Sequence, residues 1–433
     1  MMRFLYNLLF PVALLFFLPG YIAKMLRRGN YREKFGQRLG LYDRATRTTL
    51  SAGQRTWVHA VSVGEVMIAL KLVATMKQRE PILRVALTTT TTTGFALASR
   101  EAPAWLEVLY APLDFWPVMR RAFDLIRPLR IILVEAEVWP NLTAIAERRK
   151  IPLALVNARL SPRSERRFRG FNFLVRPFFR KLDLICVQEP EDVGRWQSLG
   201  VEASRIHLVG SIKFDPENAE PLPEVPRAAL QTLGIQRERP ILLGGSTHAG
   251  EEKILAEIFR ELREEFPELF LIIAPRHVER VREVASQFAE LGLRTVLRSE
   301  IAGPAPADCL LFDTTGELRD WYAVATTVFI GKSLTAHGGQ NPVEAIVADR
   351  PVVFGPHMEN FSQLARALID RGGARQADSQ TALKNALADL LRNETKREEA
   401  VRHARLVLDA HRGATARTAA LLEQLTAPAA EAI

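Results

Sequence analysis

Carboxylate side chains follow two short apolar runs in the first half of the sequence. Glu65 ends the motif HAVSVGE, just after the apolar run 56–62, while Glu135 and Glu137 lie in VEAEVWPN at the end of the run 129–135. A carboxylate in such a place can accept a proton from a hydroxyl. Glu65 could equally complement the dipole of a following helix. Alternation along a strand would send Glu135 and Glu137 to one side, where ligands, cations or local arginines would compensate for their burial.

Two neighbouring features complete this first set of polar residues. Ser62 and Gly64 belong to a short turn that would bring backbone N–H groups to the end of a strand. Lys213, in GSIKFD, precedes a proline-rich stretch, and its ammonium group could hold a substrate carboxylate or phosphate. An ordinary surface lysine is the alternative for Lys213.

The second half of the sequence carries glycine-rich and basic motifs that suit an anion. Its first motif is GGSTHAGEE, in which Ser246 or Thr247 could cap a helix whose N-terminus suits an anion, and His248 is a further cleft candidate. No Gly-Lys-Ser/Thr follows it and no GxGxxG occurs, so neither a P-loop nor the dinucleotide fingerprint is present. Next, APRH places Arg276 and His277 after an apolar run, and an arginine there suits a phosphate.

Three further loops of the second half are polar. Gly338 and Gly339 lead through Gln340 into a helix whose first turn carries Glu344, a carboxylate that could bind both hydroxyls of a ribose or could merely complement the helix dipole. The other two are Gly316-Glu317-Leu318 and GPHMENF (355–361). The sequence has no HExxH motif or spaced His/Cys/Asp cluster, which predicts no metal site, and no GxSxG nucleophile turn.

Short apolar runs alternate with helical patterns along the chain, which indicates buried parallel strands in βα units. The expected strands lie at 56–62, 84–90, 129–135, 151–157, 182–188 and 205–210, then at 240–245, 269–275, 309–313, 327–331 and 351–355. Helices are expected at about 381–391 and 396–422. We therefore expect two doubly wound α/β domains whose strand ends face one cleft. The predicted division is 1–28 (membrane anchor and basic flank), 29–214, a linker at 215–238, 239–395, and a C-terminal helix and tail at 396–433.

Charge is unevenly distributed over the 433 residues, whose formal net charge is +9. Segment 24–47 carries eight basic and two acidic residues, and segment 148–181 carries eleven basic and one acidic. A phosphorylated substrate, an anionic membrane or a nucleic acid would each be attracted to such segments. Two cysteines rule out a disulfide scaffold.

The N-terminus reads as a membrane anchor. Residues 4–23 contain no formal charge, and basic residues follow at once. About 20 apolar residues span a bilayer, although Pro11 and Pro19 also allow a kinked or shallow helix. The positive-inside rule then places the basic side, and with it the rest of the chain, in the cytoplasm.

Seven motifs occur in the order found in the 3-deoxy-D-manno-octulosonic acid (Kdo) transferases of lipopolysaccharide assembly, which the chain resembles over nearly its whole length. They are HAVSVGE, VEAEVWPN, GSTHAGE, Pro275-Arg276-His277, Gly316-Glu317-Leu318, GGQNPVE and GPHMENF. The resemblance implies a GT-B glycosyltransferase that inverts the anomeric centre, needs no cofactor or metal, and uses CMP-Kdo and a phosphorylated lipid A precursor. It implies that Glu65 is the general base, that Glu135 and Lys213 stabilise charge, and that Glu137 contributes less. It also implies that CMP is bound by Pro275, Arg276, His277, Gly316, Glu317, Leu318, Asn341, Pro342, Val343 and Glu344.

Four positions depart from the commonest family pattern: Gln37, Lys332, Gln340 and Ala345. Two other functions remain open beside Kdo transfer. One is a different two-domain nucleotide-sugar transferase with a membrane-lipid acceptor. The other is a non-catalytic basic protein that binds anionic lipid or nucleic acid, which carboxylates at strand ends disfavour because they would repel a polyanion. We therefore expect membrane lipids but no nucleic acid among the partners.

Overall fold

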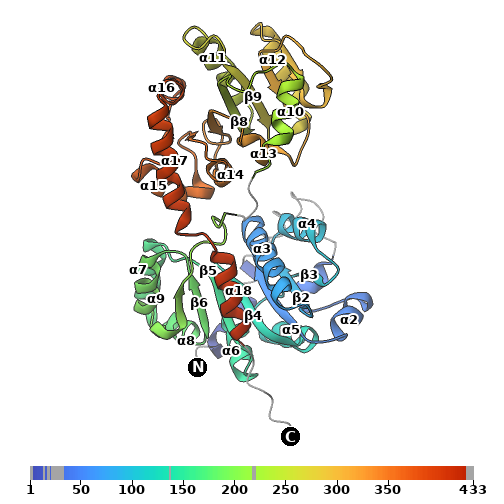
Figure 1. Cartoon of the computed structure of the whole chain (residues 1–433). Helices are drawn as coiled ribbons and strands as arrows, with labels where there is room; N and C mark the ends of the chain where they lie inside the picture. The colour runs from blue at the N-terminus through green and yellow to red at the C-terminus, as the bar shows by residue number, and fades with distance from the viewer. Residues whose placement is uncertain are drawn as a thin grey trace. The chain divides into compact units, whose positions relative to one another are not determined.

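The computed structural model describes residues 3–12, 15–16, 20, 34–135, 138–216 and 221–425. The chain divides into two compact units: unit 1 is Met1–Asp215 together with Gly413–Ile433, and unit 2 is Pro216–Arg412 (Figure 1). The second unit is thus inserted in the sequence of the first.

The described part of unit 1 contains a seven-stranded parallel sheet in the order β3-β2-β1-β4-β5-β6-β7. Its strands are β1 (Arg55–Ala60), β2 (Val85–Thr89), β3 (Leu106–Tyr110), β4 (Pro128–Val134), β5 (Leu153–Ala158), β6 (Leu184–Val187) and β7 (Ile206–Leu208). The α-helices are α2 (Arg44–Ser51), α3 (Val63–Arg79), α4 (Thr92–Glu101), α5 (Trp116–Ile126), α6 (Pro140–Arg148), α7 (Pro162–Gly170), α8 (Asn172–Phe179), α9 (Pro190–Ser198) and α18 (Ala414–Gln424), with 3-10 helices η1 (Phe35–Leu39) and η2 (Ala203–Arg205). The six strands expected here are confirmed; β3 is additional.

Unit 2 repeats the plan, and its described residues form a seven-stranded parallel sheet in the order β10-β11-β9-β8-β12-β13-β14. Its strands are β8 (Ile241–Thr247), β9 (Phe270–Pro275), β10 (Thr295–Leu297), β11 (Cys309–Leu311), β12 (Thr327–Ile330), β13 (Val352–Phe354) and β14 (Ala374–Gln376). The helices are α10 (Glu224–Thr232), α11 (Glu251–Leu262), α12 (Val281–Glu290), α13 (Leu318–Tyr322), α14 (Val343–Val347), α15 (Ser362–Asp370), α16 (Gln380–Arg392), α17 (Glu394–Asp409), η3 (Val278–Arg280), η4 (Arg298–Glu300) and η5 (Glu359–Phe361). The five expected strands are confirmed, and β10 and β14 are additional.

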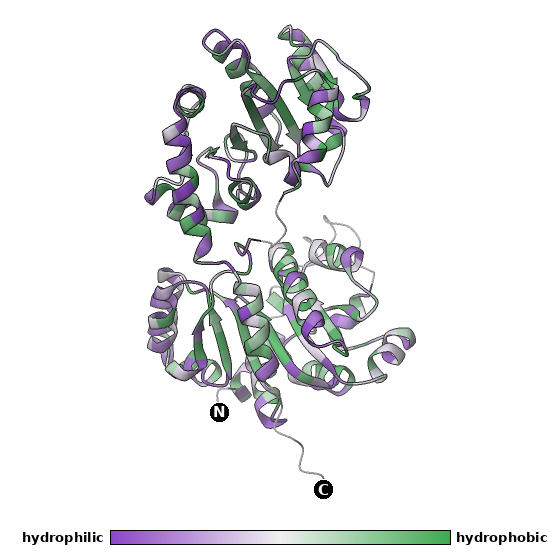
Figure 2. Cartoon of the chain, in the orientation of Figure 1, coloured by the Kyte–Doolittle hydropathy of each residue, from purple (hydrophilic) through white to green (hydrophobic). Residues whose placement is uncertain are grey.

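The central strands are buried because helices cover both faces of each sheet, and they are accordingly hydrophobic along their length (Figure 2). In unit 1 two separate apolar clusters form, one containing Trp57 and Ile131 and the other Val58 and Ile132. Neighbouring residues of one strand therefore feed opposite faces, as the two-residue period of a strand requires.

The last helix of the chain belongs to unit 1. The single charged helix expected at about 396–422 is two helices, α17 and α18, because Gly413 adopts a φ of 75° between them. Ala419 and Leu422 of α18 are buried in the same cluster as Leu72 of α3. Asp215, expected to open the linker, instead caps α18: its carboxylate accepts hydrogen bonds from the backbone N–H groups of residues 413 and 415, both at 2.8 Å.

The N-terminal segment is partly described. Residues 3–12 are helical, and the Asn7 side chain bonds to Asn141 at 2.9 Å and accepts from the Trp116 N–H at 3.1 Å. Among the described residues, none of the helices has both the length and the apolar character needed to cross a bilayer. The anchor expected at 1–28 includes residues outside the described ranges, namely 1–2, 13–14, 17–19 and 21–28.

Candidate functional site

Most candidate residues gather where the strand order of each sheet reverses. In unit 1 this point lies between β1 and β4, and in unit 2 between β8 and β12. Loops at the carboxyl ends of such strands are where doubly wound α/β sheets bind ligands. The residues at these strand ends and in the turns and first helical turns that follow are Ser62, Gly64, Glu65 and Glu135 in unit 1, and Ser246, Thr247, His248, Lys332, Gly338 and Gly339 in unit 2.

Glu65 lies in the first turn of α3, where its carboxylate accepts hydrogen bonds from the residues that begin the helix. Ser62 is the N-cap residue, and its hydroxyl donates to Glu65 Oε1 at 2.9 Å. Glu65 Oε2 accepts from the Val61 N–H at 2.9 Å, and the side chain is 9% exposed. The helix-terminus role considered for Glu65 is therefore present in the structure. Each of these contacts lies within four residues of Glu65, so the carboxylate is held by its own turn.

His59, at the end of β1, is fully buried and neutral. Its Nδ1 lies 3.0 Å from Thr88 Oγ1, and its ring packs edge-on against Trp139. Burial lowers the pKa of His59 to about 4. The ring therefore supports the strand end that leads to Glu65, and it is uncharged at neutral pH.

The structure brings Glu135 and Lys213 into electrostatic contact. Burial lowers the pKa of Lys213, the negative charge of Glu135 opposes that effect, and the positive charge of Arg159 adds to it. Arg159 follows β5 and was not among the residues expected at the site. Glu135 has a φ of 65° after β4 ends at Val134, so it does not continue the strand as the predicted alternation required. Glu137 lies outside the described residues.

Asn157 holds the turn that carries Lys213. It is buried, adopts a φ of 51°, and its Oδ1 accepts from the Ile212 N–H at 3.0 Å. The Gln188 side chain in turn donates to the Asn157 carbonyl at 2.7 Å. An asparagine in an apolar run is the signal in the sequence that could have revealed this support, because a buried amide needs partners.

Glu251, at the start of α11, joins two loops of unit 2. Its carboxylate is fully buried and accepts four backbone N–H groups, from His248 at 2.8 Å, Lys332 at 2.7 Å, Ser333 at 2.9 Å and Leu334 at 2.9 Å. Lys332 has a φ of 57°, so this departure from the family pattern sits in a strained turn. The loop after β12 is therefore fixed by a carboxylate from the loop after β8.

The two arginines after β9 differ in their contacts. Arg280 forms an ion pair with Glu252, which is completely buried, at 2.8 Å. Arg276 is exposed, and in the part of the chain that the structure describes its guanidinium has no hydrogen-bond or ion-pair partner. The ring of His277 contacts that of His248 at 5.5 Å between centroids, and burial lowers the pKa of His248. Arg276 is thus the available cation of this loop.

Glu317 is engaged by its own unit. Its Oε2 pairs with Arg298 at 3.0 Å and accepts from Trp321 Nε1 at 3.2 Å, and Oε1 bonds to the Thr314 hydroxyl. Leu318 begins α13, and Gly316 precedes this turn with a φ of 92°. The carboxylate of Glu317 holds this turn in place.

The loop before α14 brings Glu344 near a buried phenol. Asn341 Oδ1 accepts from the Val343 N–H at 3.1 Å and so starts the helix after Pro342. Burial raises the pKa of Tyr322, and the charge of Glu344 raises it further. The Tyr322 hydroxyl also lies under Gly245, where an added Cβ would come within 2.4 Å of it. Tyr322 is a neighbour of the site that the sequence motifs did not indicate.

The other three departures from the family pattern, Gln37, Gln340 and Ala345, are hydrogen-bonded or buried within their own unit. Gln37 Oε1 accepts from the Tyr110 N–H at 2.9 Å and so binds η1 to β3. The backbone of Gln340 donates to Gly331 at 3.1 Å, and Ala345 is fully buried in α14.

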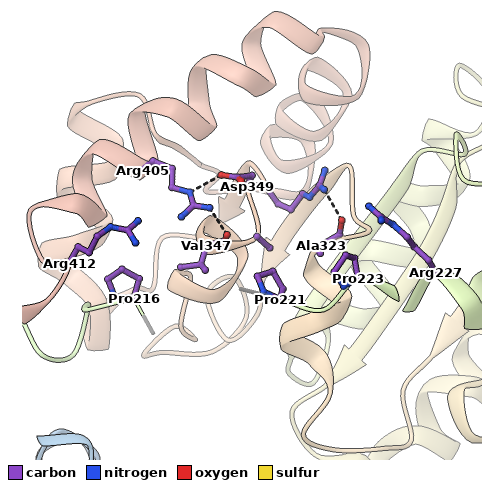
Figure 3. Close-up of a pocket in the computed structure, with 11 residues that line it drawn as sticks. Pro216, Pro221, Pro223, Arg227, Ala323, Val347, Asp349, Arg405 and Arg412 are labelled. Atoms are coloured by element: carbon purple, nitrogen blue, oxygen red, sulfur yellow. Dashed lines mark hydrogen bonds and ion pairs between the residues drawn. The ribbon is translucent and has the colours of Figure 1, made fainter. Parts of the chain in front are cut away.

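A cavity of about 310 Å³ lies elsewhere in unit 2, between the chain segments near Pro216 and α17 (Figure 3). Arg405 on its wall pairs with Asp349 at 2.7 Å, and Arg350 donates to the Ala323 carbonyl at 2.7 Å. None of the candidate residues lines this cavity.

The chain is similar to known proteins over nearly its whole length. Residues 33–216 match the family described as 3-deoxy-D-manno-octulosonic-acid transferase (kdotransferase). The 3-deoxy-D-manno-octulosonic acid transferase of Haemophilus influenzae is 32% identical over 98% of both chains, and that of Bordetella pertussis is 38% identical over 85% of this chain and 86% of its own.

Solved structures share the fold at low identity. Acinetobacter baumannii MurG is 16% identical, with a TM-score of 0.54, over 86% of this chain and 100% of its own. UDP-GlcNAc 2-epimerase from Neisseria meningitidis, bound to UDP-GlcNAc, is 10% identical with a TM-score of 0.54 over the same shares. These similarities place the two parallel-sheet units among GT-B-like structures.

Proposed function

Because the chain belongs to the 3-deoxy-D-manno-octulosonic acid (Kdo) transferase family and is thus a glycosyltransferase, we propose that it transfers Kdo from CMP-Kdo to a phosphorylated lipid A precursor. The observation that carries the proposal is the position of the candidate residues at the carboxyl ends of strands where the order of each sheet reverses. Glu65 and Glu135 lie at this position in unit 1, and in unit 2 the exposed Arg276 follows β9, the strand next to β8.

Unit 2 supplies the donor-binding groups in this proposal. The guanidinium of Arg276, which has no protein partner in the described ranges, binds the phosphate of CMP, because a charge-assisted bond to phosphate is strong. Glu344, in the first turn of α14, binds the ribose hydroxyls. Pro275, His277 and the turns at 316–318 and 341–343 line the nucleotide, as the family resemblance implies.

Unit 1 supplies the base. Glu65 accepts the proton of the acceptor hydroxyl as that oxygen attacks the anomeric carbon, and the bond from that carbon to the CMP phosphate breaks with inversion. The attacking oxygen gives up its proton to the carboxylate, and CMP leaves with the electron pair of the broken bond. An ionised carboxylate has about four lone-pair sites, and the Val61 N–H and the Ser62 hydroxyl each bond to a different oxygen of Glu65. No metal or cofactor takes part in the proposed step.

Glu135 and Lys213 act on charge near the reacting sugar. The sugar donor carries a carboxylate, and the ammonium group of Lys213 is a suitable partner for it. Glu135 keeps Lys213 charged despite the burial that lowers its pKa, since an opposite charge favours the ionised form. Glu137 has a smaller part in the proposal.

We also propose that unit 1 works at the cytoplasmic face of the inner membrane. Apolar side chains of the N-terminal segment are exposed, among them Phe4, Leu8 and Phe16, and so are Phe171 and Phe173 beside the arginines of α7 and α8. Aromatic side chains next to basic residues suit the surface of an anionic bilayer.

Mass spectrometry of a lipid A precursor incubated with the enzyme and freshly generated CMP-Kdo tests the reaction. The expected result is a mass increase of one or more Kdo groups, with no product when a UDP-sugar replaces CMP-Kdo. Absence of product with CMP-Kdo, or transfer from the UDP-sugar, would reject the proposed donor. Flotation with vesicles tests the membrane proposal: binding should require anionic lipid and weaken with salt.

A further inference from the structure

Three metal-ligating side chains converge on the loops after β12 and β13 in unit 2. His337 follows β12, His357 follows β13, and Glu359 begins η5. Within the described residues this is the one group of three or more His, Cys, Asp or Glu side chains whose ligand atoms lie within 4.8 Å of one another. The sequence shows no such site, because the ligands come from loops separated by twenty residues.

The two imidazoles face the same carboxylate oxygen. His337 Nδ1 lies 3.0 Å from Glu359 Oε1, His357 Nδ1 lies 3.4 Å from it, and the ring centroids are 4.0 Å apart. In a tetrahedral zinc site with bonds of about 2.1 Å, neighbouring ligand atoms are separated by about 3.4 Å. The observed separations are therefore close to those of two edges of such a tetrahedron.

The carboxylate is oriented by the backbone. Glu359 Oε2 accepts from the Gly338 N–H at 2.6 Å, which leaves Oε1 directed at the histidines. Hydrogen bonds of this kind to the outer atoms of ligands fix the geometry of metal sites. His337 and Glu359 are exposed and His357 is partly buried, so an ion can enter from solvent and retain water in a fourth position.

We propose that His337, His357 and Glu359 bind a divalent transition-metal ion such as Zn²⁺. Imidazole and carboxylate together favour zinc, copper or nickel over magnesium or calcium, which prefer oxygen ligands alone. The site goes beyond the proposed transfer reaction, which uses none of these side chains and no metal. Occupancy would tie the loop at Gly338 to the loop at His357 and Glu359.

Equilibrium dialysis of the full chain against Zn²⁺, after removal of metal with a chelator, tests the site. The expected result is one bound ion per chain, and His337→Ala or His357→Ala should weaken binding at least about tenfold, since even outer-shell substitutions cost about 10–100-fold. The double variant should lose little more than either single variant, because one lost ligand already breaks the site. His403→Ala, which changes a partly buried histidine of α17 outside the cluster, is the matched control.

Circular dichroism first confirms that each variant is folded, so that a loss of Zn²⁺ binding reports on the site and not on unfolding. Binding that falls in the cluster variants and persists in His403→Ala supports the site. Equal Zn²⁺ binding in all variants, or no stoichiometric binding by the parent chain, overturns it. Transfer activity is not the readout, so a failure of the proposed reaction would leave this result unaffected.

Discussion

Glu65 and Glu251 occupy corresponding positions in the two units but hold different parts of the chain. Each stands in the first turn of the helix after a central strand, β1 or β8, where the strand order reverses. Glu65 bonds to the Val61 N–H and the Ser62 hydroxyl of its own turn, whereas Glu251 also binds backbone groups 81 to 83 residues away. Glu65 closes its own turn, and Glu251 fixes a second loop.

This difference affects how easily each carboxylate can exchange a hydrogen bond for a ligand. A carboxylate with local contacts can exchange one of them for a ligand without displacing another loop. A fully buried carboxylate that satisfies four N–H groups cannot, because each donor left unpaired costs about 1–3 kcal/mol. The contacts of Glu251 assign it to loop support, and proton transfer by Glu65 remains the proposal to be tested.

The largest effect is expected from Glu65→Gln. The amide cannot act as a base, so turnover should fall about 10²–10⁴-fold while CMP affinity stays within about twofold. Initial rates and calorimetric titration of CMP measure the two quantities. Ser62→Ala is the matched control, since it removes the hydroxyl that donates to Glu65 Oε1 and keeps the carboxylate. Equal rates for Glu65→Gln and the parent would contradict the proposal that Glu65 is the base.

Glu251→Gln should act on stability instead. Its amide NH₂ would face two of the four backbone donors, which leaves them unpaired at a cost of about 2–6 kcal/mol. Hydrogen exchange at residues 248 and 332–334 should accelerate accordingly. Glu261→Gln on the exposed side of the same helix should change little, because its ion pair with Lys384 is exposed. Unchanged protection of these amides would show that the carboxylate does not hold the loop.

The two arginines after β9 differ in a similar way: Arg276 is available to a ligand, whereas Arg280 is held in an ion pair with Glu252. Arg276→Ala should weaken CMP binding about 10- to 100-fold with little loss of stability, because it removes only a contact to ligand. Arg280→Ala should destabilise unit 2, because it leaves the buried charge of Glu252 unpaired. Calorimetry and thermal unfolding of both variants give the comparison, and a reversed pattern would contradict it.

The smallest effect is expected on the pH dependence of stability, through His59 in the strand that precedes Glu65. The folded pKa of His59 is about 4, below the unfolded value of about 6.5, so its contribution to stability is present above about pH 6.5 and is lost as pH falls toward 4. His59→Gln should flatten the pH dependence of unfolding within that window. NMR titration of the imidazole provides the direct check: a midpoint near 6.5 in the folded protein would refute the assignment.

Local sequence patterns predicted the strands inside the sheets and the edge strand β7 but missed the three other edge strands. β3, β10 and β14 each form an edge, where one side of the strand has no neighbour and a continuous apolar run is not required. The turns that carry Glu65, Arg276 and Glu344 could be predicted because strand-to-helix loops have local signals.

Contacts between distant residues could not be predicted in this way. The hydrogen bonds from Lys332 to Glu251, the pairing of Glu135 with Lys213, and the convergence of His337 with Glu359 join loops that meet only in the fold. The same is true of Asp215, which looked like the start of a linker and caps a helix 198 residues later. Spacing along the chain carries no information about such pairs.

The return of α18 to unit 1 has a consequence for biosynthesis. Ala419 and Leu422 complete a hydrophobic cluster whose other members are translated before residue 213. Unit 2 is contiguous, so it can fold on the ribosome as soon as it has emerged. Unit 1 reaches its final packing only after α18 has been made, and the part of α3 that packs against α18 stays uncovered until then.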